Sequence, residues 1–214
     1  MAQLQVAIVP VTSFQQNCAI IWDVDTMQAA VFDPGGNVDR IMSMVRKLKV
    51  NVETIFLTHG HIDHAGGAMD LKDVLNVPIV GPHKDDEMLL LGIEDQAKMF
   101  EVAAPVRNAI PDQWLEEGDS VSIGGNQFQI FHCPGHAPGH VVFFCEESRF
   151  AHVGDVLFSG GIGRSDLPGG NHDDLLSSIK DKLLPLGDDI MFICGHGPDS
   201  TFGKERETNP FLVQ

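Results

Sequence analysis

The segment THGHIDH, residues 58–64, most restricts how this chain can fold, because it places four metal-binding side chains within six residues. These side chains are His59, His61, Asp63 and His64. The segment follows an apolar run typical of a strand, residues 54–57, and precedes a helical pattern that begins at Ala65. Side chains alternate along an extended backbone, so the first three would project to one side, and the fourth would turn to a neighbouring direction as the helix begins. We therefore expect a metal site at the end of a strand, with room for two adjacent ions.

Three further candidate ligands stand next to glycine, each after a β-rich run. They are His136, Asp155 and His196. Glycine lets the backbone approach closely or adopt positive φ at such a strand end. Seven ligands at one sheet edge fit a site for two divalent metal ions. Neutral imidazole and carboxylate ligands suit zinc best but also bind iron and manganese, so the ligand set leaves the metal open.

The first half of the chain predicts a sheet covered by helices. Short runs rich in valine, isoleucine and aromatic residues predict strands at 4–10, 19–23, 29–32, 54–57 and 78–81. Apolar residues at helical spacing predict helices over 38–48, 65–75 and 84–91. Residues 92–118 are irregular and predict a loop or flap beside a site.

The second half repeats this style. We expect strands at 120–123, 127–132, 141–145, 149–153 and 190–194, and a helix near 173–183. Strands and helices that alternate in two similar halves predict an α/β fold in which two mixed sheets pack together with helices outside. The absence of a linker or low-complexity segment favours one domain over residues 1–214.

Composition limits the partners and the compartment. The chain has 214 residues, 43% of them hydrophobic, and 30 acidic against 14 basic residues give a formal charge of −16. That sign disfavours nucleic-acid binding, which depends on basic surfaces. No apolar run approaches the roughly 20 residues that a membrane span needs. The N-terminus lacks the pattern of a signal peptide and four cysteines lie far apart, so we expect a cytoplasmic protein with reduced, buried thiols.

The seven candidate ligands resemble the signature of the metallo-β-lactamase superfamily, THxHxDH followed by a distant histidine, an aspartate and a final histidine. The resemblance implies an αββα sandwich. It implies that one metal is held by His59, His61 and His136, that the second is held by Asp63, His64 and His196, and that Asp155 bridges them. It also implies that Asp155 and Asp63 are catalytic, Asp63 as a ligand first and a proton acceptor second.

Within that superfamily the chain looks like the short, YcbL-type glyoxalase II proteins. The likeness rests on the segments GDVLF (residues 154–158), GGIGR (160–164) and NPF (209–211). It implies a hydroxyacylglutathione hydrolase that cleaves S-D-lactoylglutathione, or a related acyl thioester, to D-lactate and glutathione by attack of a metal-bridging hydroxide, as in methylglyoxal detoxification. The small-molecule thioester would be the partner.

The predicted substrate contact is Arg164. Long-type glyoxalase II enzymes bind glutathione with a cation and a tyrosine after this glycine-rich segment, and with an additional C-terminal helical domain. Here Arg164 fills the cationic position, Asp166 stands where the tyrosine would be, and the chain stops about where the helical domain would begin. A guanidinium matches a substrate carboxylate well, which makes the site mouth locally positive, but Arg164 could instead pair with Asp166 or Asp155.

Other functions remain open at this point. A persulfide dioxygenase of the same superfamily, with one ferrous iron, is similar in the Gly-Asp and Gly-x-Gly-Arg segments. Another superfamily hydrolase, such as a β-lactamase, and a metal-binding protein that has lost its activity are further alternatives, because fold does not fix substrate. The sequence does not indicate the oligomeric state, and a monomer is compatible with it.

Several residues near the motifs have simpler interpretations. Asp33, in a DPGG turn, could orient a ligand imidazole or be an ordinary turn carboxylate. The histidines outside the motif are expected to be structural or exposed, and Cys133 and Cys194 are expected to pack in the core. These histidines are His83, His132, His140, His152 and His172.

Overall fold

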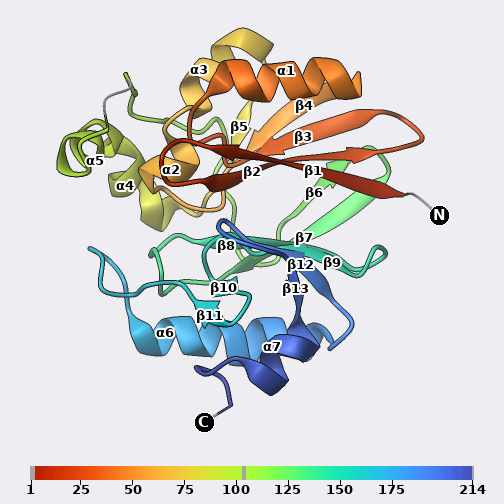
Figure 1. Ribbon diagram of the computed structural model, residues 1–214, viewed down its shortest axis with the longest axis vertical. Coiled ribbons are helices and arrows are strands. Elements are labelled where there is room, and N and C mark those ends of the chain that lie inside the picture. Colours follow the sequence, from red (N-terminus) through yellow and green to blue (C-terminus); the bar gives the residue numbers. More distant parts are fainter. Residues whose placement is uncertain (1–2, 103–104, 214) are drawn as a thin grey trace.

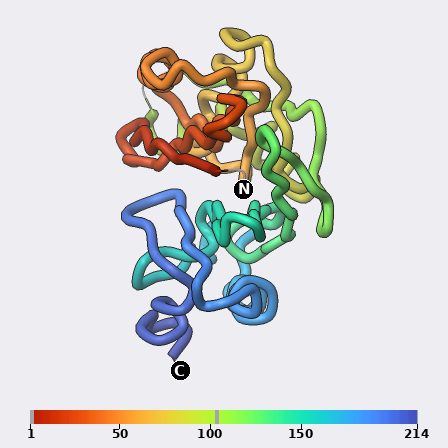
Figure 2. The backbone as a smooth tube through the Cα atoms, turned by 90° about the vertical axis from the view of Figure 1, so that its right-hand side faces the viewer, coloured from red at the N-terminus to blue at the C-terminus, as the bar shows by residue number. Residues whose placement is uncertain are grey.

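The computed structural model describes residues 3–102 and 105–213, which form two β-sheets packed face to face with helices on both outer sides (Figure 1). Within this part of the chain, the strand order of the first sheet is β1-β2-β3-β4-β5. Its strands are β1 (Leu4–Val11), β2 (Gln16–Asp23), β3 (Gln28–Phe32), β4 (Asn51–Phe56) and β5 (Ile79–Val80). The strands of the second sheet all follow residue 119, so each half of the chain builds its own sheet (Figure 2).

The second sheet has the order β13-β12-β9-β8-β7-β6 within the described residues. Its strands are β6 (Ser120–Ile123), β7 (Asn126–His132), β8 (Val141–Cys145), β9 (Phe150–His152), β12 (Met191–Ile193) and β13 (Ser200–Thr201). A small hairpin of β10 (Leu157–Phe158) and β11 (Gly161–Ile162) lies outside this sheet. Both sheets are mixed: β1, β2 and β3 pair antiparallel and β3, β4 and β5 parallel, while β12 runs parallel to β9.

Helices of the first half are α1 (Val38–Leu48), α2 (Ile62–Ala65), α3 (Ala68–Leu75), α4 (Glu87–Leu91) and α5 (Ile93–Met99), with a 3₁₀ turn η1 (Lys84–Asp86). Those of the second half are α6 (His172–Ser177), its continuations η2 (Ser178–Leu183) and η3 (Leu184–Leu186), and α7 (Phe202–Thr208). In Figure 1, α1 and α3 cover the first sheet, and α6 and α7 cover the second. Parallel strands need such crossover helices, which explains why α1 and α3 separate β3, β4 and β5.

Helix α1 shows how the local sequence specifies its element. Ile41 and Val45 lie on one face and are buried, while Arg46 and Lys47 occupy the last turn, where cations interact favourably with the helix dipole. The helix ends at Lys49, which adopts a left-handed conformation and donates its backbone N–H to the carbonyl of Val45.

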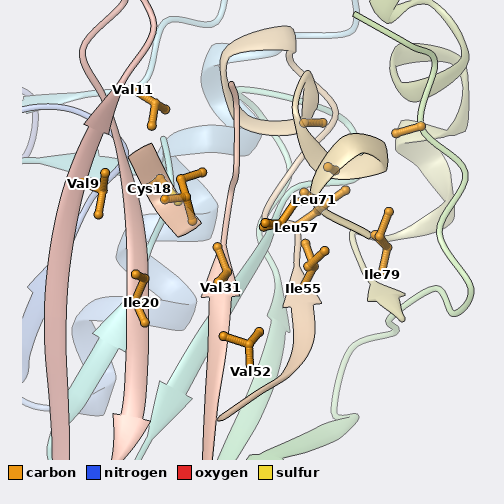
Figure 3. Packing of buried hydrophobic residues seen from close by; sticks show 14 of the residues in the cluster. Val9, Val11, Cys18, Ile20, Val31, Val52, Ile55, Leu57, Leu71 and Ile79 are labelled. Atoms are coloured by element: carbon orange, nitrogen blue, oxygen red, sulfur yellow. The ribbon is translucent and has the colours of Figure 1, made fainter. Parts of the chain in front are cut away.

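Three apolar layers hold the sandwich together. One lies between the first sheet and its helices and includes Val9, Ile20, Val31 and Leu71 (Figure 3). The central layer lies between the sheets, where Phe32 of β3 contacts Phe143 of β8 edge to face at 5.0 Å between ring centroids. The third layer lies between the second sheet and α6, η2 and α7.

The predicted αββα architecture is confirmed, but two local predictions are wrong and two features were not predicted. The predicted helix from Ala65 is two helices, because the chain breaks at Gly66 and Gly67. Residues 93–99, predicted to be irregular, form α5. The hairpin β10–β11 and the pair β13–α7 were not predicted. Within the segment 92–118, residues 103 and 104 lie outside the described residues.

None of the helices in the described ranges is long and apolar enough to cross a membrane. The four cysteines, all of them described, are buried and free, as predicted.

Candidate metal centre

The seven predicted ligands meet at one end of the sandwich. His59, His61, Asp63 and His64 follow β4 of the first sheet. The other three come from loops after strands of the second sheet: His136 after β7, Asp155 after β9 and His196 after β12. Strands β7, β9 and β12 point in the same direction, so their carboxyl ends share one edge. The loops of both sheets therefore converge on one site.

We call His59, His61 and His136 the three-histidine half-site. One ring nitrogen of each lies within 4.8 Å of the others, and His61 Nδ1 is 3.0 Å from His136 Nε2. All three side chains are buried. Their grouping agrees with the ligand set that the sequence predicted for one metal.

We call Asp63, His64 and His196 the carboxylate half-site. Their candidate ligand atoms also lie within 4.8 Å of one another, and His196 Nε2 is 3.1 Å from Asp63 Oδ2. This half-site is more open, since the side chains of Asp63 and His196 are 17% and 32% exposed. Asp63 does not lie on an extended backbone with His59 and His61, as the alternation argument assumed. It lies in helix α2, which begins at Ile62.

Asp155 lies between the half-sites. Its Oδ1 is 3.3 Å from His64 Nε2, and its Oδ2 is 3.5 Å from His136 Nε2 and 3.6 Å from His196 Nε2. One carboxylate thus faces imidazoles of both half-sites, which is the position expected of a ligand shared by two ions.

The donor atoms fit divalent cations because several are buried without a hydrogen bond. Among the described residues, these are His59 Nε2, His64 Nε2 and Asp155 Oδ1, of which the last two face each other at 3.3 Å. A buried polar atom without a hydrogen bond costs free energy, and three such atoms that face one site fit the binding of a cation. There is also no spare space for a side chain here, because a Cβ at Gly195 would overlap the Asp155 carboxylate and the His64 ring.

Asp33 orients two of the imidazoles. Its Oδ2 accepts hydrogen bonds from His64 Nδ1 at 2.9 Å and from the Thr58 hydroxyl at 2.7 Å, and that hydroxyl lies 2.9 Å from His59 Nδ1. With Nδ1 of each ring donating, Nε2 keeps its lone pair for a metal. The structure therefore favours the first interpretation of Asp33, in which its carboxylate orients ligand imidazoles, over that of an ordinary turn carboxylate.

Burial keeps the three-histidine half-site neutral. Desolvation, reinforced by His136, lowers the pKa of His61 to about 3, and desolvation with nearby imidazoles such as His64 holds the pKa of His59 well below its usual value. The pKa of His136 is also lowered by burial, although Asp155 opposes this effect. Neutral imidazole is the form that binds metal ions.

The carboxylate half-site has the opposite character. Burial alone would lower the pKa of His64, but Asp155, Asp63 and Asp33 together raise it well above its usual value. The hydrogen bond from His196 to Asp63, aided by Asp155, raises the pKa of His196 against its burial. The same imidazoles lower the pKa of Asp63 and of Asp155 despite burial. Without metal, this half-site therefore holds protons that a cation must displace.

A cavity of about 410 Å³ opens onto the centre. Its polar wall is formed by candidate ligands, including His61, Asp63, Asp155 and His196. Its apolar wall is formed by Phe14, Ile62, Phe100, Phe158, Ile162 and Leu167. Phe100 follows α5, so the segment 92–118 lies beside the site, as predicted, although its first part is helical. Such a cavity admits a small, partly apolar ligand to the metal centre.

Arg164 is the one lysine or arginine among the described residues that line this cavity. Its guanidinium donates to both oxygens of Asp166, at 2.8 Å each, and both side chains are largely exposed. The sequence left open whether Arg164 contacts substrate or pairs with Asp166, and the structure contains the pair. The Arg164 carbonyl has a further role that the sequence did not indicate, since it accepts a hydrogen bond from His136 Nδ1 at 2.8 Å.

Two of the other histidines were correctly expected to be structural. His152 is buried and stacks on Phe32, with 4.8 Å between ring centroids. His140 is buried as well, but its Nε2 accepts the backbone N–H of Asp155 at 3.0 Å, so it supports the bridging residue directly. The pattern Gly-His alone gave no signal for this contact.

A second group of ligand atoms lies outside the centre. His83, Asp85 and His132 bring one such atom each within 4.8 Å of the others. The two rings stack at 4.1 Å with an interplanar angle of 21°, and His83 Nε2 already bonds Glu116. An ion lies near the plane of each imidazole that coordinates it, so two nearly parallel rings do not share one ion in this arrangement.

Comparison with known proteins gives a consistent family. The family model described as "Metallo-beta-lactamase superfamily" matches residues 11–196. A protein of Haemophilus influenzae named hydroxyacylglutathione hydrolase GloC is 46% identical over 211 residues, which cover 98% of each chain.

Two solved structures are also similar. The crystal structure of the BLEG-1 B3 metallo-β-lactamase has a TM-score of 0.88 at 33% identity and covers 99% of this chain and 100% of that one. The structure of TTHA1623 in a di-iron-bound form has a TM-score of 0.87 at 35% identity and covers 97% and 100%.

Proposed function

The chain belongs to the metallo-β-lactamase superfamily, and from that premise we propose that it is a hydrolase with two divalent metals that cleaves S-D-lactoylglutathione or a related acyl thioester. The observation that carries the proposal is the pair of half-sites with Asp155 between them. The substrate class follows from the 46% identity, over nearly the whole of both chains, to a protein named hydroxyacylglutathione hydrolase.

We assign His59, His61 and His136 to one metal, Asp63, His64 and His196 to the other, and Asp155 to both. Two cations held there would lower the pKa of a water molecule to about 7 and polarise the thioester carbonyl.

The side chains around the centre prepare it for this reaction. Asp33 fixes the rings of His59 and His64, through Thr58 in the first case, so both present Nε2 to the site. The apolar wall excludes water from the acyl group and strengthens electrostatic interactions within the cavity. We assign Asp63 the role of a ligand first and of a proton acceptor second. A thiolate leaves readily, so no general acid is required.

A thiol-release assay tests the proposal. Purified protein loaded with Zn²⁺ or Fe²⁺ should release glutathione from S-D-lactoylglutathione, and protein stripped by a chelator should not until metal is restored. Metal-loaded protein that releases no thiol would show that the substrate or the reaction is wrongly assigned.

Metal analysis bears on the remaining alternatives. Elemental analysis should find two ions per chain, of zinc or, as in the di-iron form of TTHA1623, of iron. One iron per chain, with oxygen consumption on glutathione persulfide, would favour the dioxygenase instead. Similarity to BLEG-1 makes β-lactam hydrolysis the second candidate, which a chromogenic cephalosporin assay tests on the same samples.

A further inference from the structure

Side chains from outside the metal centre hold the backbone on both sides of His61. The Gly60 N–H donates to Asp86 Oδ2 at 2.7 Å. The Gly60 carbonyl accepts from Gln96 Nε2 at 3.1 Å, and the Ile62 N–H donates to Gln96 Oε1 at 2.9 Å. Both polar backbone groups of Gly60 and the N–H of Ile62 are thus bound by side chains of η1 or α5.

The second oxygen of Asp86 reaches another ligand loop. Asp86 Oδ1 accepts the N–H of Gly139 at 2.5 Å, and Gly139 lies three residues after His136. The Gly139 carbonyl in turn accepts the N–H of His83, just before η1. One carboxylate therefore joins the loop that carries His61, in the first half of the chain, to the loop that carries His136, in the second half.

The position of Asp86 is unusual for a carboxylate. Its side chain is fully buried, and no lysine or arginine among the described residues pairs with it. Aspartate is almost never fully buried without a partner, and here the hydrogen-bond partners are two backbone N–H groups. A buried carboxyl group that bonds only to two ligand loops has its effect on those loops.

Packing keeps both loops against this carboxylate. A Cβ at Gly60 would lie 2.7 Å from Leu89 Cβ, and a Cβ at Gly139 would lie 2.6 Å from the His83 carbonyl oxygen. Only glycine fits at either place, so the close approach of both N–H groups is built into the sequence.

We infer that Asp86 and Gln96 are positioning residues for the three-histidine half-site, and that the segment from η1 to α5 is the frame that sets the separation of His61 and His136. Neither residue lines the substrate cavity, and neither is a candidate ligand. Gln96 also holds Ile62, the first residue of α2, but Asp33 binds the His64 ring directly, so we expect the carboxylate half-site to depend less on this frame. The inference rests on the metal assignment made above and is independent of the substrate.

Metal affinity is the measurement that separates positioning from general stability. Asp86→Asn keeps the shape but leaves one acceptor oxygen for two N–H groups, and Gln96→Leu removes both of its hydrogen bonds to the His61 loop. Residues that orient metal ligands typically change affinity by about 10–100-fold. We expect a loss of that size for one of two metal equivalents in each variant, with the second equivalent bound nearly as in the parent.

Titration with Co²⁺ against a chelator measures both equivalents, and the visible absorption of bound Co²⁺ reports the ligand geometry of each. Asp95→Asn is the matched control, since Asp95 lies on α5 next to Gln96, is 81% exposed and pairs only with Lys98 among the described residues. Thermal unfolding of the metal-free proteins fixes a temperature at which all are folded. If Asp86→Asn does not fold, Gln96→Leu carries the test.

The outcomes are distinct. Weaker binding and an altered spectrum for one equivalent support the inference. Parent-like affinities for both equivalents in folded Asp86→Asn and Gln96→Leu overturn it, as does an equal loss at both equivalents, which indicates a general structural role. A parent that binds no metal overturns the metal assignment and the inference together, whereas a parent that binds two metals but releases no thiol overturns only the proposed reaction.

Discussion

The three-histidine half-site and the carboxylate half-site take their residues in the same way, two from the segment after β4 and one from a loop of the second sheet, yet they differ in charge. The first contains three buried imidazoles whose pKa values are lowered, chiefly by burial. In the second, carboxylates raise the pKa values of His64 and His196. Similar construction thus yields one half-site that is ready for a cation and one that first has to release protons.

Burial and charge therefore shift the histidine pKa values of the two half-sites in opposite directions, although the half-sites lie next to each other. Desolvation favours the neutral ring of His136 even with Asp155 close by, and it is overcome where three aspartates surround His64. Asp155, which faces both groups, is the residue through which the two halves of the centre act on each other.

The strongest test of this comparison removes the shared residue. Asp155→Ala should lose at least one metal equivalent and should lower turnover by more than roughly 10³-fold, the upper range for one transition-state contact, because both half-sites lose a ligand. Elemental analysis and the thiol-release assay measure these effects. Unchanged turnover would mean that the two half-sites do not work as one centre.

The next largest effect is the pH dependence of metal binding. A histidine with a raised pKa must release its proton to bind metal, so affinity at the carboxylate half-site should fall as the pH drops below the raised pKa values of His64 and His196. Once both rings are protonated, the loss is about a hundredfold per pH unit, about tenfold for each proton displaced. The three-histidine half-site should keep its ion to lower pH, since its rings are already neutral.

Metal content after dialysis over a series of pH values checks this order. Calorimetry in buffers of different ionisation enthalpy gives the protons released per equivalent, which should be fewer for the equivalent retained at low pH. Simultaneous loss of both ions, with equal proton release, would contradict the contrast between the half-sites.

A smaller pH effect is expected at His152, a buried histidine outside the set of candidate ligands whose pKa is also lowered. Burial lowers its pKa to about 4, from an unfolded value near 6.5. Below pH 6.5 His152 therefore takes up a proton in the unfolded chain, whereas in the folded chain it does so only near pH 4. As the pH falls from 6.5 to about 4, the free energy of unfolding therefore decreases by about 3 kcal/mol for this group, at 1.36 kcal/mol per pKa unit.

Urea unfolding of metal-free protein between pH 8 and pH 4 measures this loss. His152→Phe keeps a ring against Phe32 and removes the titration, so the free energy of unfolding should fall less steeply below pH 6.5. Above pH 7 the curves of variant and parent should run parallel, which serves as the internal control. An unchanged acid slope would place the acid sensitivity in other groups.

The smallest predicted effect lies at the cavity mouth, outside both half-sites. Asp166→Asn frees the guanidinium of Arg164 and removes a negative charge. Exposed ion pairs are weak, so KM for the anionic S-D-lactoylglutathione should fall by no more than about fivefold. An uncharged thioester of N-acetylcysteamine should show no change in KM, and a matching decrease for both substrates would indicate an effect other than charge.

The sandwich and the convergence of the seven candidate ligands could both be predicted from the sequence, because both follow from local patterns. Strand periodicity and the glycine beside His136, Asp155 and His196 do not depend on the rest of the molecule. Helix α5 was missed because only Ile93 and Ala97 are buried on it, which is too short an apolar pattern for a helix to be recognised.

Contacts made by backbone atoms could not be predicted at all. The bonds of Asp86 to Gly60 and Gly139, and of the Arg164 carbonyl to His136, join positions 26 to 53 residues apart, and their partners are main-chain groups that every residue carries. Glycine at positions 60 and 139 permits the close approach of the backbone, but residue type does not identify the side chain that binds it. The pairing of Arg164 with Asp166 was one of the alternatives that the sequence left open. It depends on a loop conformation that composition does not determine.

Each half-site combines two residues of the first sheet's loop with one residue of the second sheet, and this arrangement has a mechanical consequence. A cation in either half-site would cross-link the two halves of the chain without a covalent bond. The sheets could then separate only after the bonds of His136, Asp155 and His196 to metal, or those from the first half of the chain, had broken, so the lifetime of the folded protein would follow the exchange rate of its ions. Unfolding and metal release would become a single kinetic event.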